Sequence, residues 1–542
     1  MHQITANLID LHTKTIYPAT VETSAGQIVS ITPSKNPCEH YILPGFIDAH
    51  IHIESSMLIP SEFARLATPH GTVATVSDPH EIGNVLGLSG VRFMIETGRK
   101  VPFHFFFGAP SCVPATTFET AGANLTAKEI EELFLIDGLS YLSEMMNYPG
   151  VLQKLPDVMA KIELAKSLGK PIDGHAPGLR GERAKQYITA GISTDHECYL
   201  LEEAIEKIQY GMKIIIREGS AAKNFEALHP LIKLHPNQVM LCSDDKHPHE
   251  LVRGHINQLV RRAVVEKGYD LFDVLRCACI HPILHYGLDV GMLRVGDRAD
   301  FIVIEDLKSF NVLQTYISGL LVAEKGKSYI SSIQTTPINK FHSRKIQANS
   351  IAVKAAGNKM RVIEAFDGEL ITKEQMIEVN NQKTFLESYP EQDILKMVVV
   401  NRYADAHPAV GFIKNFGLKK GAIASSIAHD SHNIIALGVA DEEIVQSINA
   451  LMKCQGGISV FDGSEVSVLP LPYAGLMSGE DGYQVAKEYE RLDQEAKKLG
   501  SKLQAPFMTL SFMALLVIPS LKLSDKGLFD GDKFNFVDLT SR

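Results

Sequence analysis

The sequence predicts an α/β protein: a metal-dependent (β/α)8 barrel, a small β-sandwich domain beside it and an additional C-terminal α/β domain. Two observations favour this fold class. Between residues 44 and 285, short apolar runs alternate with longer amphipathic stretches, and eight such alternations over about 245 residues are typical of a (β/α)8 barrel. On both sides of this region, apolar and polar residues alternate with turn residues between them, as they do in short strands.

The predicted barrel consists of apolar strand segments separated by helix-like segments. Helix candidates include "TAKEIEELFLI", "LPDVMAKIELAKSLG" and "LLEEAIEKIQYG", each of which ends at a polar residue or glycine. The predicted strands are 46–52, 72–77, 103–107, 138–144, 172–175, 192–195, 213–217 and 238–242.

The remaining segments are predicted to form two further domains. Residues 1–43 and 286–340 show the same short-strand pattern, and we expect them to combine into one composite small β domain. The polar passage "SSIQTTPINKFHSRKIQANS" is predicted to be a linker. Residues 350–542 are predicted to form the C-terminal α/β domain.

Composition argues against several classes of partner. The formal net charge of the 542 residues is −10 and Lys and Arg do not cluster, which argues against a nucleic-acid polymer as partner. The apolar segment "SFMALLVIP" is much shorter than the roughly 20 residues of a membrane span. The start "MHQITANLID" lacks the pattern of a signal peptide, and seven scattered cysteines suit a reducing compartment. We therefore expect a cytoplasmic protein whose partners are small molecules or copies of itself.

Histidine and carboxylate residues follow five of the predicted strands. The stretch "LPGFIDAHIHIESSM" places two imidazoles on the same side of a strand, and chemistry in such barrels gathers at the carboxyl ends of the strands. A single loop histidine is usually solvated, but this joint placement predicts a metal site for Zn, Fe or Mn. Six ligands are too many for one tetrahedral zinc, whereas two ions bridged by Glu144 satisfy the count. The six candidates are His50, His52, Glu144, His175, His196 and Asp244.

The motifs around these residues resemble those of adenine deaminases of the amidohydrolase superfamily. Superfamily features are "PGFIDAHIH", single histidines after the fifth and sixth strands, an aspartate after the eighth, and "GDRADFIVI". More specific segments are "HIESSM", "VSDPHEIGNV", "PSCVPAT", "GHAPG", "REGSAAKN" and "AHDSHNIIALGV", which together run through nearly the whole chain. Glu144 stands where many relatives in the superfamily have a carboxylated lysine, which argues against cyclic-amide hydrolases.

The resemblance implies an enzyme of purine salvage. It implies hydrolytic deamination of adenine to hypoxanthine and ammonia, by a hydroxide bridged between two divalent ions, Mn or Fe with Zn as an alternative. It also implies a homo-oligomer, a dimer or larger. One alternative is an amidohydrolase acting on another aminated heterocycle or a cyclic amide. An alternative of a different class is an inactive barrel that serves as an interaction scaffold, although such a protein should have lost ligands.

The resemblance also suggests roles for individual residues. We expect His50 and His52 to hold one ion and His175 and His196 the other. Asp244 is expected to contact the first ion, take a proton from the nucleophile and pass it toward the departing ammonia. Glu81 is the candidate for protonating a ring nitrogen of the purine.

Further residues are expected around the substrate and the ligands. Ser111, Cys112, Arg217 and Glu218 are candidates for lining the purine pocket, with packing or an ion pair as the alternative for each. Asp78 and His80 are expected to brace the site, and His247 to lie behind a ligand. The downstream "HDSHN", with His429 and His432, is expected to close over or brace the active site from the C-terminal domain, with a further metal site or a turn cap as alternatives.

Overall fold

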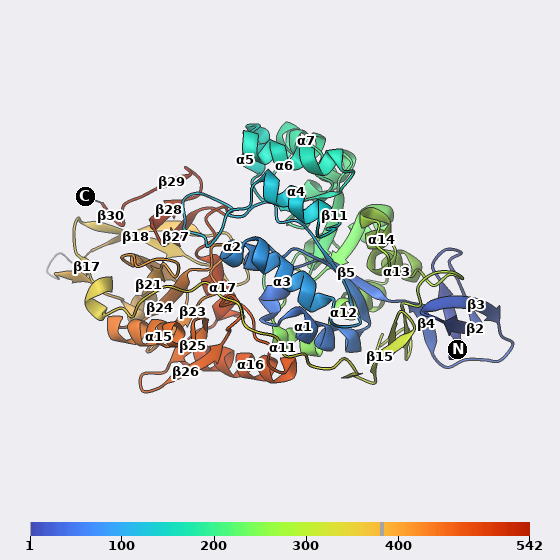
Figure 1. The fold of residues 1–542 in the computed structure, drawn as a ribbon. Helices are drawn as coiled ribbons and strands as arrows, with labels where there is room; N and C mark the ends of the chain where they lie inside the picture. Colours follow the sequence, from blue (N-terminus) through green and yellow to red (C-terminus); the bar gives the residue numbers. More distant parts are fainter. Residues whose placement is uncertain (1, 380–383, 542) are drawn as a thin grey trace.

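The computed structural model describes residues 2–379 and 384–541 of the chain. The molecule is elongated, with a β-sheet region at the N-terminal end, a central region of strands and helices, and a second α/β region at the C-terminal end (Figure 1). The α/β class predicted from the sequence is confirmed.

The apolar runs of the central region form parallel strands. The strands are β5 (Phe46–Ile51), β6 (Thr72–Ser77), β7 (His104–Phe107), β8 (Leu142–Met145), β9 (Ile172–Gly174), β10 (Thr194–Asp195), β11 (Lys213–Arg217) and β12 (Val239–Cys242). Strands β5, β6 and β7 pair in order, as do β8 with β9, and β10 with β11 and β12. Strand β12 lies beside β5. The amide of Asp244, just after β12, donates to the carbonyl of His50 in β5 at 2.9 Å.

The strand boundaries follow the sequence pattern with one clear exception. The fourth strand was expected to begin at Gly138, but β8 begins at Leu142. Gly138 has a φ of 74°, which places its backbone in the left-handed region and excludes it from an extended strand.

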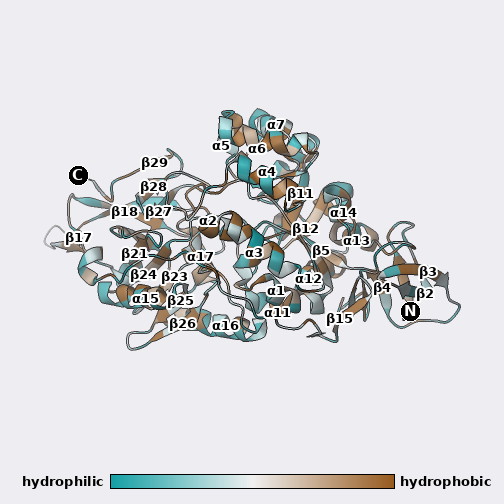
Figure 2. Ribbon diagram, viewed as in Figure 1, coloured by the Kyte–Doolittle hydropathy of each residue, from teal (hydrophilic) through white to brown (hydrophobic). Residues whose placement is uncertain are grey.

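Amphipathic helices cover the central strands, and in Figure 2 they carry hydrophobic and hydrophilic residues along the same helix. Helix α4 begins with a capping box between Thr126 and Glu129, and α6 has a proline at its first position. The helices of this region are α1 (Pro60–Ala67), α2 (His80–Leu86), α3 (Leu88–Gly98), α4 (Ala127–Leu135), α5 (Tyr148–Leu152), α6 (Pro156–Ser167), α7 (Gly181–Thr189), α8 (Leu201–Gln209), α9 (Phe225–Leu228), α10 (Leu231–Leu234), α11 (Pro248–Arg253), α12 (Ile256–Arg261), α13 (Leu271–Cys279) and α14 (His281–Tyr286).

The strands that flank the central region combine into one sheet. Its order is β16-β15-β14-β13-β4-β1-β2-β3. Strand β4 pairs in parallel with β1 and antiparallel with β13, which joins both halves. Among the described residues these strands share one hydrogen-bonded sheet, and the packing of that sheet as a β-sandwich stays a prediction. Its strands are β1 (His2–Asp10), β2 (Thr15–Ser24), β3 (Gln27–Pro33), β4 (Tyr41–Pro44), β13 (Phe301–Ile304), β14 (Val312–Ile317), β15 (Leu320–Glu324) and β16 (Lys327–Ser328).

The C-terminal region is built on a mainly antiparallel sheet of the order β19-β18-β22-β21-β24-β23-β25-β26, with β30 beside β18. These strands are β18 (Lys359–Glu364), β19 (Lys373–Glu378), β21 (Ile394–Val400), β22 (Ala409–Lys414), β23 (Ala422–Ser425), β24 (Ile434–Gly438), β25 (Gly457–Phe461), β26 (Val466–Pro470) and β30 (Thr540–Ser541). Other elements are α15 (Asp441–Cys454), α16 (Gly482–Lys498), α17 (Pro506–Phe512), β17 (Val353–Lys354), β20 (Phe385–Leu386), β27 (Leu521–Ser524), β28 (Gly527–Asp530) and β29 (Asn535–Phe536).

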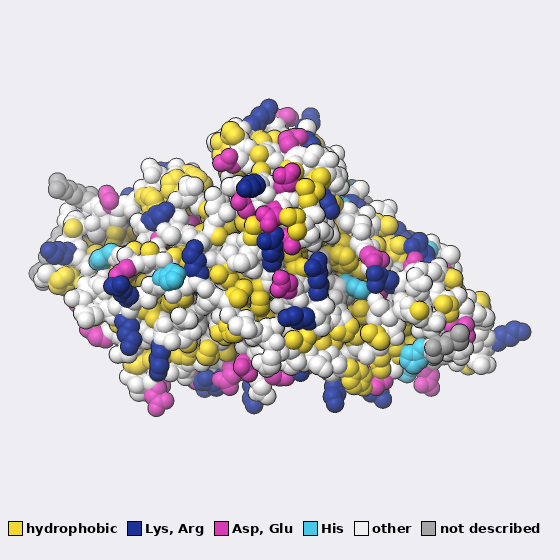
Figure 3. All heavy atoms as spheres, in the orientation of Figure 1, with side chains coloured by type: hydrophobic (Ala, Val, Ile, Leu, Met, Phe, Trp, Pro, Cys, Tyr) yellow, Lys and Arg dark blue, Asp and Glu magenta, His cyan; other side chains and the backbone are white. Residues whose placement is uncertain are grey.

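The C-terminal region is attached to the central region next to the first strand. The amide of Ser478 donates to the carbonyl of Met57 at 2.8 Å, and Arg65 of α1 forms an ion pair with Asp481 at 2.9 Å. On the face shown in Figure 3, cationic and acidic side chains are interspersed among hydrophobic ones. Among the described residues, no helix is both long and apolar enough to cross a membrane.

Candidate active site

The structure brings together the six side chains that the sequence predicts as metal ligands. They come from the carboxyl ends of neighbouring parallel strands, so they meet at one end of the central region. All six side chains are buried. His50 lies in β5 and Glu144 in β8. His52, His175 and His196 directly follow β5, β9 and β10, and Asp244 lies two residues after the end of β12.

The donor atoms of the first group face one another. Nε2 of His50 lies 3.3 Å from Nε2 of His52, and Oδ1 of Asp244 lies 3.5 Å and 3.3 Å from these two nitrogens. Ligand atoms about 2.0–2.2 Å from a shared cation are themselves separated by about 3–3.5 Å. Oδ1 of Asp244 is buried and has no hydrogen-bond partner among residues 2–379 and 384–541. This donor set therefore fits a divalent cation.

Glu144 stands between the two pairs of histidines. Its Oε1 lies 3.2 Å from Nε2 of His52, and its Oε2 lies 2.7 Å from Nδ1 of His175 and 3.3 Å from Nε2 of His196. Burial alone would raise the pKa of Glu144, but His175 and the other imidazoles hold it well below its usual range. An ionised carboxylate in this position can bridge two cations.

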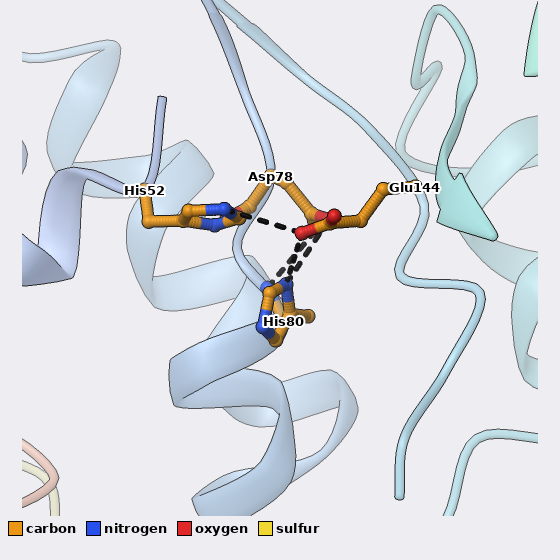
Figure 4. Close-up of side chains that lie close together, drawn as sticks. All are labelled: His52, Asp78, His80 and Glu144. Carbon is orange, nitrogen blue, oxygen red and sulfur yellow. Dashed lines mark hydrogen bonds and ion pairs between the residues drawn. The ribbon is translucent and has the colours of Figure 1, made fainter. Parts of the chain in front are cut away.

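Asp78 and His80, expected as braces, also lie against this cluster. Nδ1 of His80 is 3.1 Å from Oδ2 of Asp78 and 3.6 Å from Oε1 of Glu144. Figure 4 shows His52, Asp78 and His80 gathered around the carboxylate of Glu144. Potential ligand atoms of these four residues all lie within 4.8 Å of one another, so Asp78 and His80 are close enough to influence how a cation is held.

Glu81 is paired with histidines from the C-terminal region. Nδ1 of His429 lies 2.6 Å from its carboxylate, and Nε2 of His432 contacts the other carboxylate oxygen. Burial would raise the pKa of Glu81, but these imidazoles lower it well below its usual value. Burial in turn would lower the pKa of His429, but Glu81 raises it to about 9. These opposite pKa shifts favour an ionised Glu81 beside a protonated His429, and the role of Glu81 as proton donor stays a prediction.

Arg217 lines the cavity at this cluster and also forms an ion pair with Asp244, the alternative that the sequence leaves open. Its Nη1 donates to Oδ2 of Asp244 at 2.7 Å, and its Nη2 donates to Glu197 at 2.9 Å. Burial would raise the pKa of Asp244, but Arg217 and the nearby imidazoles lower it well below its usual range. The sequence reasoning missed Glu197, for which the only signal was its position directly after a ligand in "TDHE".

Four of the predicted site residues do not line the cavity at the cluster. The hydroxyl of Ser111 donates to the carbonyl of Glu144 at 2.6 Å, and Cys112 packs against Met145, so both support β8. Glu218 pairs with Arg262 at 2.7 Å and faces a different cavity. Nδ1 of His247 lies 2.8 Å from the hydroxyl of Tyr489 in α16.

Residues of the C-terminal region line a cavity of about 30 Å³ at this cluster. The ring of Phe512 stacks on His429 with 4.9 Å between centroids. Ligand pockets usually exceed about 300 Å³, so a substrate requires these side chains to move apart. The sequence reasoning missed the apolar residues, because no local pattern marks them as neighbours of the ligands, whereas Asp245 directly follows the ligand Asp244 in "LCSDD". The lining residues of the C-terminal region are Leu370, His429, Asp430, Phe512 and Leu515.

The fold and its buried histidine–carboxylate cluster define the class of metal-dependent amidohydrolases. A model of the amidohydrolase family matches residues 41–322, and a model of the adenine deaminase C-terminal domain matches residues 369–535. Among solved structures, N-acetyl-D-glucosamine-6-phosphate deacetylase from Mycobacterium smegmatis matches with a TM-score of 0.47 and 16% identity, covering 60% of this chain and 100% of its own.

Full-length relatives identify the family. The proteins named adenine deaminase from Sulfurovum sp. (strain NBC37-1) and Salinibacter ruber (strain DSM 13855 / M31) are 56% and 54% identical to this chain. The matches cover 100% and 99% of this chain, and 100% and 98% of the relatives. The chain belongs to the adenine deaminase family, which confirms the resemblance seen in its motifs.

Proposed function

We propose that this protein hydrolyses adenine to hypoxanthine and ammonia in purine salvage. The observation that carries the proposal is the position of the Glu144 carboxylate between His52 and the pair His175 and His196, in a chain whose full-length relatives are named adenine deaminase. The alternatives, another heterocycle or cyclic amide and an inactive scaffold, are not favoured, because these relatives share the whole chain and every expected ligand is present.

We infer that two divalent ions are held per chain, Mn or Fe with Zn as an alternative. His50, His52 and Asp244 would hold one, His175 and His196 the other, and Glu144 would bridge them. Such ions supply Lewis-acid activation, which lowers the pKa of water from about 15.7 to about 7.

Asp244 is suited to accept the proton of the attacking water. Arg217 holds its Oδ2 at 2.7 Å, which fixes the carboxylate and keeps it ionised. From there the proton can pass to the departing amine. Glu197 holds the other side of the guanidinium and therefore acts as a positioning residue.

The pair of Glu81 and His429 is suited to deliver a proton to a purine ring nitrogen. Both residues line the cavity, and their atoms lie 2.6 Å apart. Because Glu81 raises the pKa of His429 to about 9, His429 is suited to store the proton at neutral pH and Glu81 to hold and relay it.

We also propose the arrangement around this site. Strands β5–β12 would close into a (β/α)8 barrel over residues 44–285, next to the composite β domain of 1–43 and 286–340 and the C-terminal domain of 350–542. A cytoplasmic location is supported by seven free cysteines. A homo-oligomer remains a prediction, and light scattering during gel filtration tests it.

The test of the function is direct. Purified protein loaded with Mn or Fe is mixed with adenine, and both hypoxanthine and ammonia are measured. The two products should form in equal amounts. Turnover of another aminated heterocycle or a cyclic amide without turnover of adenine would move the assignment to the second hypothesis. No turnover by protein that holds both ions would favour the scaffold.

A further inference from the structure

A second polar cavity, of about 190 Å³, lies between the segments that follow β11 and β12. It does not include any of the six candidate ligands. Six residues with charged side chains line this cavity in the described part of the chain. Four of them are cationic and two are acidic. They are Glu218, Lys223, Lys246, Glu250, Arg253 and Arg262.

The two acidic side chains are already engaged. Glu218 pairs with Arg262 at 2.7 Å, and Glu250 accepts a hydrogen bond from the hydroxyl of Ser220 at 2.6 Å. Arg262 also pairs with Glu226 at 2.8 Å, and Arg253 with Glu490. The lysines differ, because neither Lys223 nor Lys246 has an ion-pair or hydrogen-bond partner for its ammonium within 2–379 and 384–541.

Lys246 is the unusual member of this group. Its residue is only 8% exposed, yet its side chain lines the cavity. Its ammonium has no ion-pair partner among the described residues, so an anion that enters the cavity can form a charge-assisted contact with it.

We propose that this cavity is a binding site for a small phosphate-class dianion, held by Lys246 and Lys223 with Arg253 at its edge. Donors from different segments surround the cavity, which suits a tetrahedral anion with several acceptor oxygens. The segments after the seventh and eighth strands are a frequent location for phosphate sites in (β/α)8 proteins. The volume is below the about 300 Å³ of common ligand pockets, so it suits a phosphate group rather than a whole nucleotide.

The cavity shares a wall with the candidate active site. Lys246 follows Asp244 by two residues, and Ser243 lines the cavity while its amide donates to Asp48 of β5 at 3.0 Å. His255, also in the wall, contacts the same carboxylate at 2.8 Å. Bound phosphate would therefore stabilise the segment that carries Asp244 without occupying the position of the substrate.

The test measures binding of inorganic phosphate to the metal-loaded full-length protein by calorimetry and by the shift of the thermal unfolding midpoint. Lys246→Met should weaken phosphate binding by about tenfold or more, because one charge-assisted contact is removed. Lys223→Met should also weaken it, and it keeps the test decisive if the buried substitution prevents folding. The matched control, Lys185→Met on the exposed face of α7, should bind as the wild type does.

Kinetics separate this site from phosphate bound at the metal centre. Phosphate bound in the proposed cavity should not compete with adenine, so it should not raise the apparent KM for adenine. A phosphate monoester such as AMP is the second probe: tighter binding than inorganic phosphate would identify a phosphate ester, and weaker binding would identify the free anion. The proposal is overturned if the wild type fails to bind either probe at millimolar concentration, or if Lys246→Met and Lys223→Met both bind as the wild type does.

Discussion

At the scale of single residues, Glu144 links the two halves of the candidate metal site. Its two oxygens face His52 on one side and His175 and His196 on the other. Glu144→Ala should therefore lower the metal content from two ions per chain to one or fewer, and reduce adenine turnover by about 10²-fold or more. Elemental analysis after gel filtration measures the content. The exposed Glu163→Ala on α6 serves as the control. If Glu144→Ala retains two ions per chain, then Glu144 does not bridge them.

His429 is the second residue with a measurable signature. Its pKa of about 9 is raised by Glu81, so activity that needs its proton should be full at neutral pH and fall as the pH rises through about 9. His429→Asn should lower kcat by about 10²-fold and abolish this alkaline limb. The measurements are pH profiles of kcat with the metal content checked in parallel. An unchanged alkaline limb in the variant would show that another group supplies the proton.

At the scale of elements, strand β27 fixes two parts of the cavity wall through Lys522. Its fully buried Nζ donates to the carbonyls of Leu370 at 2.6 Å and Phe512 at 3.0 Å, and both of these residues line the cavity. Burial lowers the pKa of Lys522 from 10.5 to about 7. The unfolded chain therefore binds one proton more between these pH values, and the folded state gains stability as the pH rises from 7 toward 10.5.

Lys522→Met removes this dependence. The free energy of unfolding of the wild type, relative to the variant, should increase by up to about 5 kcal/mol between pH 7 and 10.5. Denaturant unfolding of both proteins at several pH values measures the difference. Parallel pH profiles for the two proteins would contradict the expectation that Lys522 titrates in this range.

The elements also show what a sequence can predict. Apolar runs with β-branched residues identified segments such as 213–217, and the histidines at their ends follow from strand geometry. The contact of Glu81 with His429 joins residues 348 positions apart, and only the general role of closing or bracing the site could be expected for "HDSHN". Glu218 forms the ion pair that was left open as its alternative, but its partner Arg262 follows another strand and could not be named from the sequence.

At the scale of the whole molecule, the active site depends on how the C-terminal region is seated on the central one. Helix α16 is held against α1 by the ion pair of Arg65 with Asp481 and by the amide of Gly482, which donates to Glu62 at 2.9 Å. The same helix carries Tyr489, whose hydroxyl contacts His247 in the segment after Asp244. A shift of α16 should therefore lower the stability of the molecule and also displace the candidate catalytic residues.

Gly482 is the position that tests this coupling. A Cβ atom there would lie 2.6 Å from the side chain of Leu66 and 3.3 Å from that of Leu58, so Gly482→Leu should push α16 away from α1. Overpacking of this kind costs about 1–3 kcal/mol, and we expect a lower thermal unfolding midpoint together with a lower kcat/KM for adenine. Gln484 is exposed on the same turn, so the control Gln484→Leu adds the same side chain without pushing α16 away from α1. If both variants unfold at the same temperature and turn over adenine equally, then the seating of α16 does not control the site.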